Sequence, residues 1–175
     1  MTEMICAGFG GQGVLMTGMI LAYCAMKSGQ NFTWYPSYGS EMRGGTANCN
    51  IKISETEIAS PYAKYPDLVI SMNDVAIDKF EKQIKKGGML LVNSTLLSPE
   101  RVFREDIKVI RVPATEIANE LNNPRGANIV MLGRWCRETG LFEKNFMQET
   151  IDEYFEKKGK KNPGNKLCFE AGFSR

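Results

Sequence analysis

A glycine-rich hexapeptide near the start of the chain has the residue types and spacing of a phosphate-binding loop. Gly8-Phe9-Gly10-Gly11-Gln12-Gly13 matches the pattern G-x-G-x-x-G between an apolar strand predicted at 3–7 and an apolar helix predicted at 14–28. Glycine permits the tight turn, and the amides that open the helix point at an anion. The sequence therefore predicts ligand contacts at Gly8, Gly10, Gly11, Gln12 and Gly13. A strand-to-helix turn that packs against a neighbour is the alternative.

The pattern is incomplete for a nicotinamide dinucleotide. Such a site needs an acidic residue at the end of the second strand, where it holds a ribose hydroxyl. The second strand, predicted at 31–35, continues into Pro36, and the first acidic residue after it is Glu41. The spacing disfavours a dinucleotide and leaves other phosphate-bearing ligands open.

A second unusual loop is predicted at 36–45, where it follows the second strand. The carboxyl ends of parallel strands meet at one edge of the sheet, so this loop should lie beside the glycine loop. Arg43 is the best candidate there for a phosphate or carboxylate partner. The alternative is an ion pair, either between Glu41 and Arg43 or across an interface, that only stiffens the loop. The candidate binding residues in this loop are Ser37, Tyr38, Glu41, Arg43, Gly44 and Gly45.

The chain contains no histidine, which excludes a histidine general base, a Ser–His or Cys–His nucleophile pair and a histidine-ligated metal. The five cysteines lie far apart and form no C-x-x-C pair, so neither an iron–sulfur nor a zinc-ribbon spacing is present. We expect buried free thiols, no metal site and no catalytic residue in this chain. These cysteines are Cys6, Cys24, Cys49, Cys136 and Cys168.

Charge and hydropathy indicate a cytoplasmic protein. The 175 residues carry a net charge of +2, which predicts neither a nucleic-acid partner nor a membrane-binding face. The longest apolar run, 14–26, is too short to span a bilayer, and the N-terminus has no basic leader. The basic run at 157–161 is interpreted as a solvated helix end, with a docking patch as the alternative.

Alternating strands and helices predict a single α/β domain over 1–175 with a Rossmann-like, open, mainly parallel sheet and helices on both faces. The segment 46–53 alternates polar and apolar residues, which predicts a half-exposed strand. A turn at 54–57 should follow, with a hairpin return from Ile58. Asn73 is a predicted N-cap. Further strands are expected at 67–71, 89–93 and 106–112, and helices at 74–86, 127–139 and 142–158, with a short one within 165–175, so that the C-terminal third is helical.

The two loops together resemble the gamma subunit of 2-oxoacid:ferredoxin oxidoreductases. The resemblance rests on Gly-Phe-Gly-Gly-Gln-Gly-Val at 8–14 and Pro-Ser-Tyr-Gly-Ser-Glu-Met-Arg-Gly-Gly at 36–45. Asn-Ile-Val-Met-Leu-Gly at 128–133 also resembles the family, so the similarity extends over nearly the whole chain.

The resemblance implies an accessory, non-catalytic subunit. Such enzymes convert a 2-oxoacid and coenzyme A (CoA) to an acyl-CoA and reduce ferredoxin. Thiamine diphosphate, Mg²⁺ and the iron–sulfur clusters belong to partner alpha, beta and delta subunits, and the gamma domain is associated with CoA. The expected substrate is 2-oxoglutarate or a branched-chain 2-oxoacid such as 2-oxoisovalerate, rather than pyruvate. Two alternatives stay open: a free-standing nucleotide-binding oxidoreductase and a purely structural adaptor.

Overall fold

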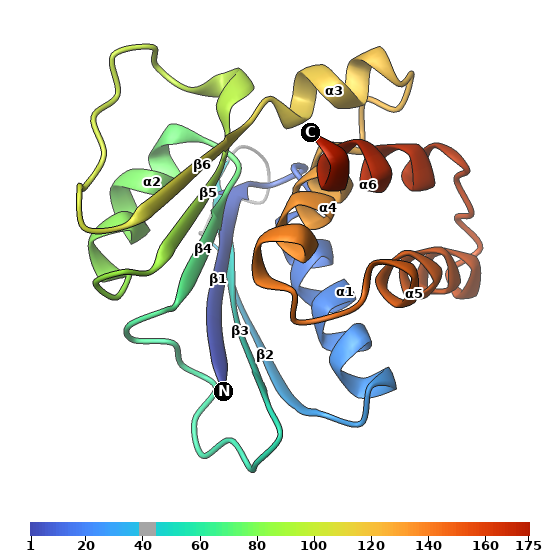
Figure 1. The fold of residues 1–175 in the computed structure, drawn as a ribbon, viewed down its shortest axis with the longest axis horizontal. Helices are drawn as coiled ribbons and strands as arrows, with labels where there is room; N and C mark the ends of the chain where they lie inside the picture. Colours follow the sequence, from blue (N-terminus) through green and yellow to red (C-terminus); the bar gives the residue numbers. More distant parts are fainter. Residues whose placement is uncertain (39–44) are drawn as a thin grey trace.

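A six-stranded, mostly parallel sheet divides the molecule (Figure 1). The computed structural model describes residues 1–38 and 45–175. The strand order is β2-β3-β1-β4-β5-β6; β1, β4, β5 and β6 are parallel, and β3 is antiparallel to both of its neighbours. The predicted mainly parallel α/β sheet is confirmed. The strands are β1 (Thr2–Phe9), β2 (Asn31–Tyr38), β3 (Thr46–Ser54), β4 (Leu68–Ser71), β5 (Met89–Asn93) and β6 (Lys108–Val112).

The helices cover the two faces of the sheet unequally. One face packs against α1 (Val14–Lys27), α3 (Ala114–Glu120), α4 (Ala127–Thr139), α5 (Lys144–Lys157) and α6 (Gly164–Ser174). The other face packs against α2 (Asp74–Phe80), which lies on the opposite side of the sheet from α1 in Figure 1. Single 3-10 turns follow at Glu81–Gln83 and Ser94–Leu96. Helices on both faces are therefore confirmed, as is the helical C-terminal third.

The strand predicted at 46–53 is confirmed as β3, but its predicted half-exposure is wrong. β3 is buried along nearly its whole length, because it lies between β2 and β1 rather than at an edge. Its polar face is covered as well: Asn48, Asn50 and Lys52 are each at most 6% exposed. Lys52 forms an ion pair with Glu3 at 3.2 Å, and the Asn50 Oδ1 accepts a hydrogen bond from the Ala63 amide. We refer to Asn48, Asn50 and Lys52 as the β3 polar row.

The second strand is longer than predicted. β2 continues to Tyr38, so 36–38 belong to a strand and not to a loop. Proline is tolerated at position 36 because β2 is an edge strand of the described sheet, where an outward-facing residue needs no N–H for a ladder bond. The hairpin return expected at Ile58 is also wrong, since residues 55–67 contain no strand and instead cross the β3 polar row.

Three other element boundaries differ from those predicted. The predicted helix at 74–86 ends at Phe80, because the backbone changes there to a single 3-10 turn and is extended at Ile84. The last strand begins at Lys108 rather than 106, and α5 begins at Lys144 rather than 142. The Asn73 Oδ1 accepts a hydrogen bond from the Ala76 amide, which confirms the predicted cap of α2.

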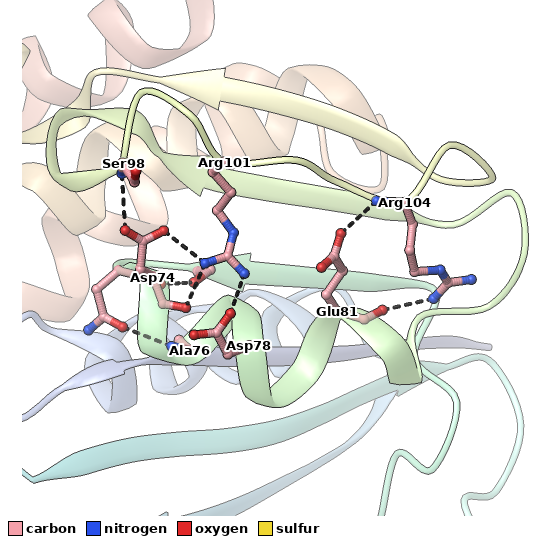
Figure 2. Close-up of polar contacts among 9 residues, drawn as sticks. Asp74, Ala76, Asp78, Glu81, Ser98, Arg101 and Arg104 are labelled. Carbon is pink, nitrogen blue, oxygen red and sulfur yellow. Dashed lines mark hydrogen bonds and ion pairs between the residues drawn. The ribbon is translucent and has the colours of Figure 1, made fainter.

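Residues 97–107 form an irregular strap across the outer side of α2 (Figure 2). The Arg101 guanidinium donates to the carboxylate of Asp74 at 3.0 Å and also binds Asp78. Arg104 donates from its backbone and its side chain to Glu81. α2 is therefore held on its outer side by polar contacts, while its inner side is apolar.

Among the described residues, no helix has the length and hydropathy needed to cross a membrane.

Candidate functional site

The glycine loop needs glycine at three of its positions. A Cβ on Gly8 would lie 2.7 Å from the Gln12 Oε1 and 2.9 Å from the Met72 Cβ. Gly11 and Gly13 have φ values of 95° and 74°, which disfavour other L-residues. The loop therefore departs from β1 in a conformation that only this glycine pattern permits without strain.

Gln12 turns inward and ties the glycine loop to the turn after β4. Its Oε1 accepts hydrogen bonds from the Phe9 amide at 2.7 Å and the Asn73 Nδ2 at 2.9 Å. Its Nε2 donates to the Met72 carbonyl at 3.4 Å. The chain goes from β1 to α1 on one face and from β4 to α2 on the other, which is the switch point where open α/β sheets bind dinucleotides. Here the Gln12 amide bridges that crevice.

A groove of about 410 Å³ lies on the other side of the loop. We name it the glycine-loop groove. It is formed by the glycine loop, the first turn of α1 and the adjoining ends of β2 and β3. Its lining residues are Phe9, Gly10, Gly11, Gly13, Val14, Leu15, Met16, Tyr38, Gly45, Thr46 and Ala47.

The first turn of α1 has backbone donors at this groove that no described backbone group satisfies. Gly13 is the N-cap and provides no side chain to cap the helix, and the turn contains no acidic residue. Within the described residues, the amides of Val14, Leu15 and Met16 donate to no other backbone group. The Gly13 carbonyl, in contrast, accepts from the amide and hydroxyl of Thr17 and from the Asn128 Nδ2. An uncapped helix start of this kind attracts an anion.

The two predicted loops do meet. The Gly10 amide donates to the Gly45 carbonyl at 3.0 Å, so the end of the second loop lies against the glycine loop. Tyr38 lines the same groove and is 67% exposed. Ser37 faces the opposite side of the sheet, because side chains alternate along β2. The predicted residues Glu41, Arg43 and Gly44 lie outside the described residues.

Ser37 belongs to a second, smaller cavity of about 230 Å³. Asn48 and Asn50 of the β3 polar row form its floor, and α2 and residues 62–63 form its walls. The Tyr35 and Tyr62 rings meet edge to face above the floor, with centroids 6.4 Å apart. The cavity is lined by Ile5, Tyr35, Ser37, Asn48, Asn50, Tyr62, Ala63, Lys79, Phe80 and Gln83.

The cysteines are buried and free, as predicted. A hydrogen bond with Cys49 and burial hold the pKa of Cys6 well above its ordinary value. Burial raises the pKa of Cys24 to about 12 and that of Cys136 to about 11. These thiols stay protonated at neutral pH and are poor metal ligands. Within residues 1–38 and 45–175, no group of three or more Cys, Asp or Glu side chains is placed to hold a metal ion.

Sequence reasoning missed two asparagines at this site. Asn73 was expected only as a helix cap, and nothing in the pattern indicates its bond to Gln12, sixty-one residues away. Asn128 lies at the start of α4 and packs on Gly13, where an added Cβ would be 2.6 Å from its Nδ2. The sequence similarity at 128–133 pointed to this segment without explaining it.

The fold and the groove define a class: an open α/β domain whose glycine loop leads into a helix start with no side-chain cap among the described residues. The chain matches the family of pyruvate ferredoxin/flavodoxin oxidoreductases over residues 3–175, and it belongs to that family. The resemblance predicted from the two loops is thereby confirmed.

Named relatives agree with this family. The ketoisovalerate oxidoreductase subunit VorA of Methanothermobacter marburgensis is 39% identical over 168 residues, which cover 95% of this chain but 34% of the relative. This chain thus spans about a third of that protein's length. The 2-oxoglutarate synthase subunit KorC of Methanocaldococcus jannaschii is 34% identical, and the match covers 98% of this chain and 91% of that subunit. The crystal structure of a keto/oxoacid ferredoxin oxidoreductase gamma subunit from Geobacter sulfurreducens superposes with a TM-score of 0.79 at 27% identity, covering 99% of this chain and 96% of the other.

Proposed function

We propose that this chain is the gamma subunit of a 2-oxoacid:ferredoxin oxidoreductase. The complex would oxidatively decarboxylate a 2-oxoacid, transfer the acyl group to CoA and pass two electrons to ferredoxin. The family membership supports this proposal, as do relatives named for ketoisovalerate and 2-oxoglutarate. These names favour a branched-chain 2-oxoacid or 2-oxoglutarate as the substrate.

The proposed role of the chain within the complex is to bind CoA at the glycine-loop groove. The observation that carries this role is the uncapped first turn of α1, where the amides of Val14, Leu15 and Met16 open onto the groove. Backbone amides in this arrangement suit a phosphate group. Apolar side chains of Phe9, Leu15 and Met16 line the same groove and suit the uncharged arm of CoA. Arg43 would add a positive charge from the second loop.

The redox chemistry is assigned to partner chains. In this proposal thiamine diphosphate, Mg²⁺ and the iron–sulfur clusters are held by alpha, beta and delta subunits, and no side chain of this subunit is catalytic. The protonated, buried thiols and the lack of histidine support that division. Free thiols also favour a reducing cytoplasm.

The test compares Arg43→Ala with Arg137→Ala in the purified complex. Arg137 is exposed in the last turn of α4, whereas the glycine loop contacts Asn128 in the first turn of this helix, so Arg137→Ala controls for loss of one positive charge. Arg43→Ala should raise the KM for CoA about tenfold and leave the KM for the 2-oxoacid unchanged, because one charge-assisted contact to phosphate is lost. Arg137→Ala should change neither constant.

Two results would contradict the proposal in different ways. An unchanged KM for CoA together with weaker subunit assembly would identify the groove as a protein contact, as expected of a structural adaptor. Saturable binding of a nicotinamide dinucleotide to the isolated chain, followed by Trp34 fluorescence, would identify a free-standing nucleotide-binding enzyme.

A further inference from the structure

We propose that Asn73 is a positioning residue for the glycine loop. It acts through Gln12, whose side-chain amide it holds in one orientation. Together the two side chains would keep the first turn of α1 open towards its ligand. The effect on CoA rests on the proposed function, whereas the effect on the loop does not.

Asn73 uses both ends of its amide and is 5% exposed. Its Oδ1 is committed to α2, since it accepts from the Ala76 amide at 2.9 Å. Its Nδ2 therefore faces Gln12 and donates to the Gln12 Oε1 at 2.9 Å. Because the Asn73 Oδ1 caps α2, the Asn73 side chain presents its donor, the Nδ2, and not its acceptor to Gln12 in the glycine loop.

The donor at Asn73 determines which way the Gln12 amide points. With its oxygen towards Asn73, Gln12 also accepts from the Phe9 amide and donates to the Met72 carbonyl. The reversed amide would place NH₂ against the Phe9 N–H and oxygen against the Met72 carbonyl. Both contacts would then be mismatched in a half-buried site, where unmade hydrogen bonds are costly.

The frame around Asn73 is fixed by separate contacts. The Met72 amide donates to the Ala7 carbonyl at 2.9 Å, and the Ser71 hydroxyl donates to the Asn73 carbonyl at 2.8 Å. The next residue, Asp74, accepts from the Ser98 amide and from Arg101 in the strap (Figure 2). A change confined to the Asn73 amide therefore leaves α2 in place.

Asn73→Asp and Asn73→Ser separate the two roles of this residue. Both aspartate and serine are good N-caps and should keep α2 intact. Neither can donate from the Nδ2 position to Gln12. The serine variant is uncharged, so any effect that it shares with the aspartate variant does not arise from a new negative charge.

Asn93→Asp is the matched control. Asn93 is the last residue of β5, much as Asn73 lies just after β4, and it is fully buried. Its Oδ1 accepts hydrogen bonds from the first two amides of α3, those of Ala114 and Thr115. It has no hydrogen bond to the glycine loop among those described. It should therefore reproduce any general cost of the substitution without affecting the loop.

Two readouts are taken on the assembled complex. The first is amide hydrogen exchange of peptides spanning 8–16. Both Asn73 variants should exchange about fivefold to tenfold faster there, the factor expected for loss of one hydrogen bond, while Asn93→Asp should not. The second is steady-state kinetics. Both Asn73 variants should raise the KM for CoA about fivefold without lowering kcat, which indicates lost binding rather than lost chemistry.

Hydrogen exchange tests the positioning role of Asn73, and the KM for CoA tests the proposed function of the groove. Unchanged exchange at 8–16 in both Asn73 variants would overturn the positioning role, whatever the kinetics show. Faster exchange with an unchanged KM for CoA would leave the positioning role standing and would contradict CoA binding at the groove.

Discussion

The two faces of the sheet are held by different forces. The face that carries α1 is apolar and closely packed: an added Cβ on Gly18 would lie 2.5 Å from the Cys49 Sγ. The face that carries α2 combines a smaller apolar core with the β3 polar row and the strap. We infer that changes of volume will act mainly on the first face. Changes of charge will act mainly on the second.

The largest effect is expected where α4 meets α6. A Cβ on Gly172 would lie 1.9 Å from the Val130 carbonyl oxygen, so the two helices would have to separate. Gly172→Ala should lower the free energy of unfolding by about 3 kcal/mol or more. Chemical denaturation measures this loss. Exposed Ser174→Ala on the same helix is the control and should stay within about 0.5 kcal/mol of the parent protein. Equal stability of the two variants would show that the close contact is not required.

The next effect should come from the β3 polar row. The side chains of Lys52 and Glu3 are 8% and 16% exposed. Lys52→Met should cost about 2 kcal/mol, because it leaves the Glu3 carboxylate without its partner. Adding Glu3→Gln should recover most of this loss, and denaturation of the single and double variants measures the coupling. Additive losses would show that the pair does not interact.

A smaller effect is expected at the strap. Arg101 contacts two carboxylates, Asp74 and Asp78, through its planar fork. Arg101→Lys keeps the charge but loses this geometry, which should cost about 1 kcal/mol. The cost should shrink in high salt, where ion pairs are screened. Arg125 is exposed and forms no ion pair within the described residues, so Arg125→Lys should have no effect on unfolding at either salt concentration. A salt-independent loss at Arg101 would indicate packing rather than charge.

The smallest effect should appear on the α1 face, at an exposed cluster between α1 and α5. Hydrogen bonds from Lys157, Lys27 and Tyr23 lower the pKa of Glu153 from 4.5 to about 2. Because the pKa is lower in the folded state, the carboxylate stabilises the fold above pH 4.5. This contribution is lost as the pH falls through about 2. Urea unfolding gives the free energies of unfolding of the parent protein and of Glu153→Gln. The gap between these two free energies should be constant above pH 4.5 and close towards pH 2. A gap that persists at pH 2 would exclude this ionisation as its source.

Local signals were sufficient to predict most elements. Gly140 has a φ of 58° and follows the last residue of α4, so the helix ends at 139 as predicted. Asn73 caps α2 through a contact three residues away, which sequence spacing reveals directly. Such features depend on neighbours in the chain, and so they can be read from one sequence.

Features that depend on distant partners were not predicted. The alternation at 46–53 places polar and apolar side chains on opposite faces of the strand, but it does not show what covers those faces. β3 is an interior strand because both β1 and β2 pair with it. The inward turn of Gln12 depends on Met72 and Asn73, which the fold brings to the same edge of the sheet. The sequence therefore predicted that the two segments meet, while the contacts that Gln12 makes between them and the turn after β4 needed the structure.

Pro36 has a consequence for how the protein behaves in concentrated solution. β2 is an eight-residue edge strand with no charged side chain, and its residues include Phe32, Tyr35 and Tyr38, each more than a third exposed. Strands of this composition tend to pair with one another and aggregate. A proline in the strand cannot donate a ladder hydrogen bond, so a second β2 cannot add along its full length. One residue thereby helps to keep an uncharged, aromatic strand from starting a fibre.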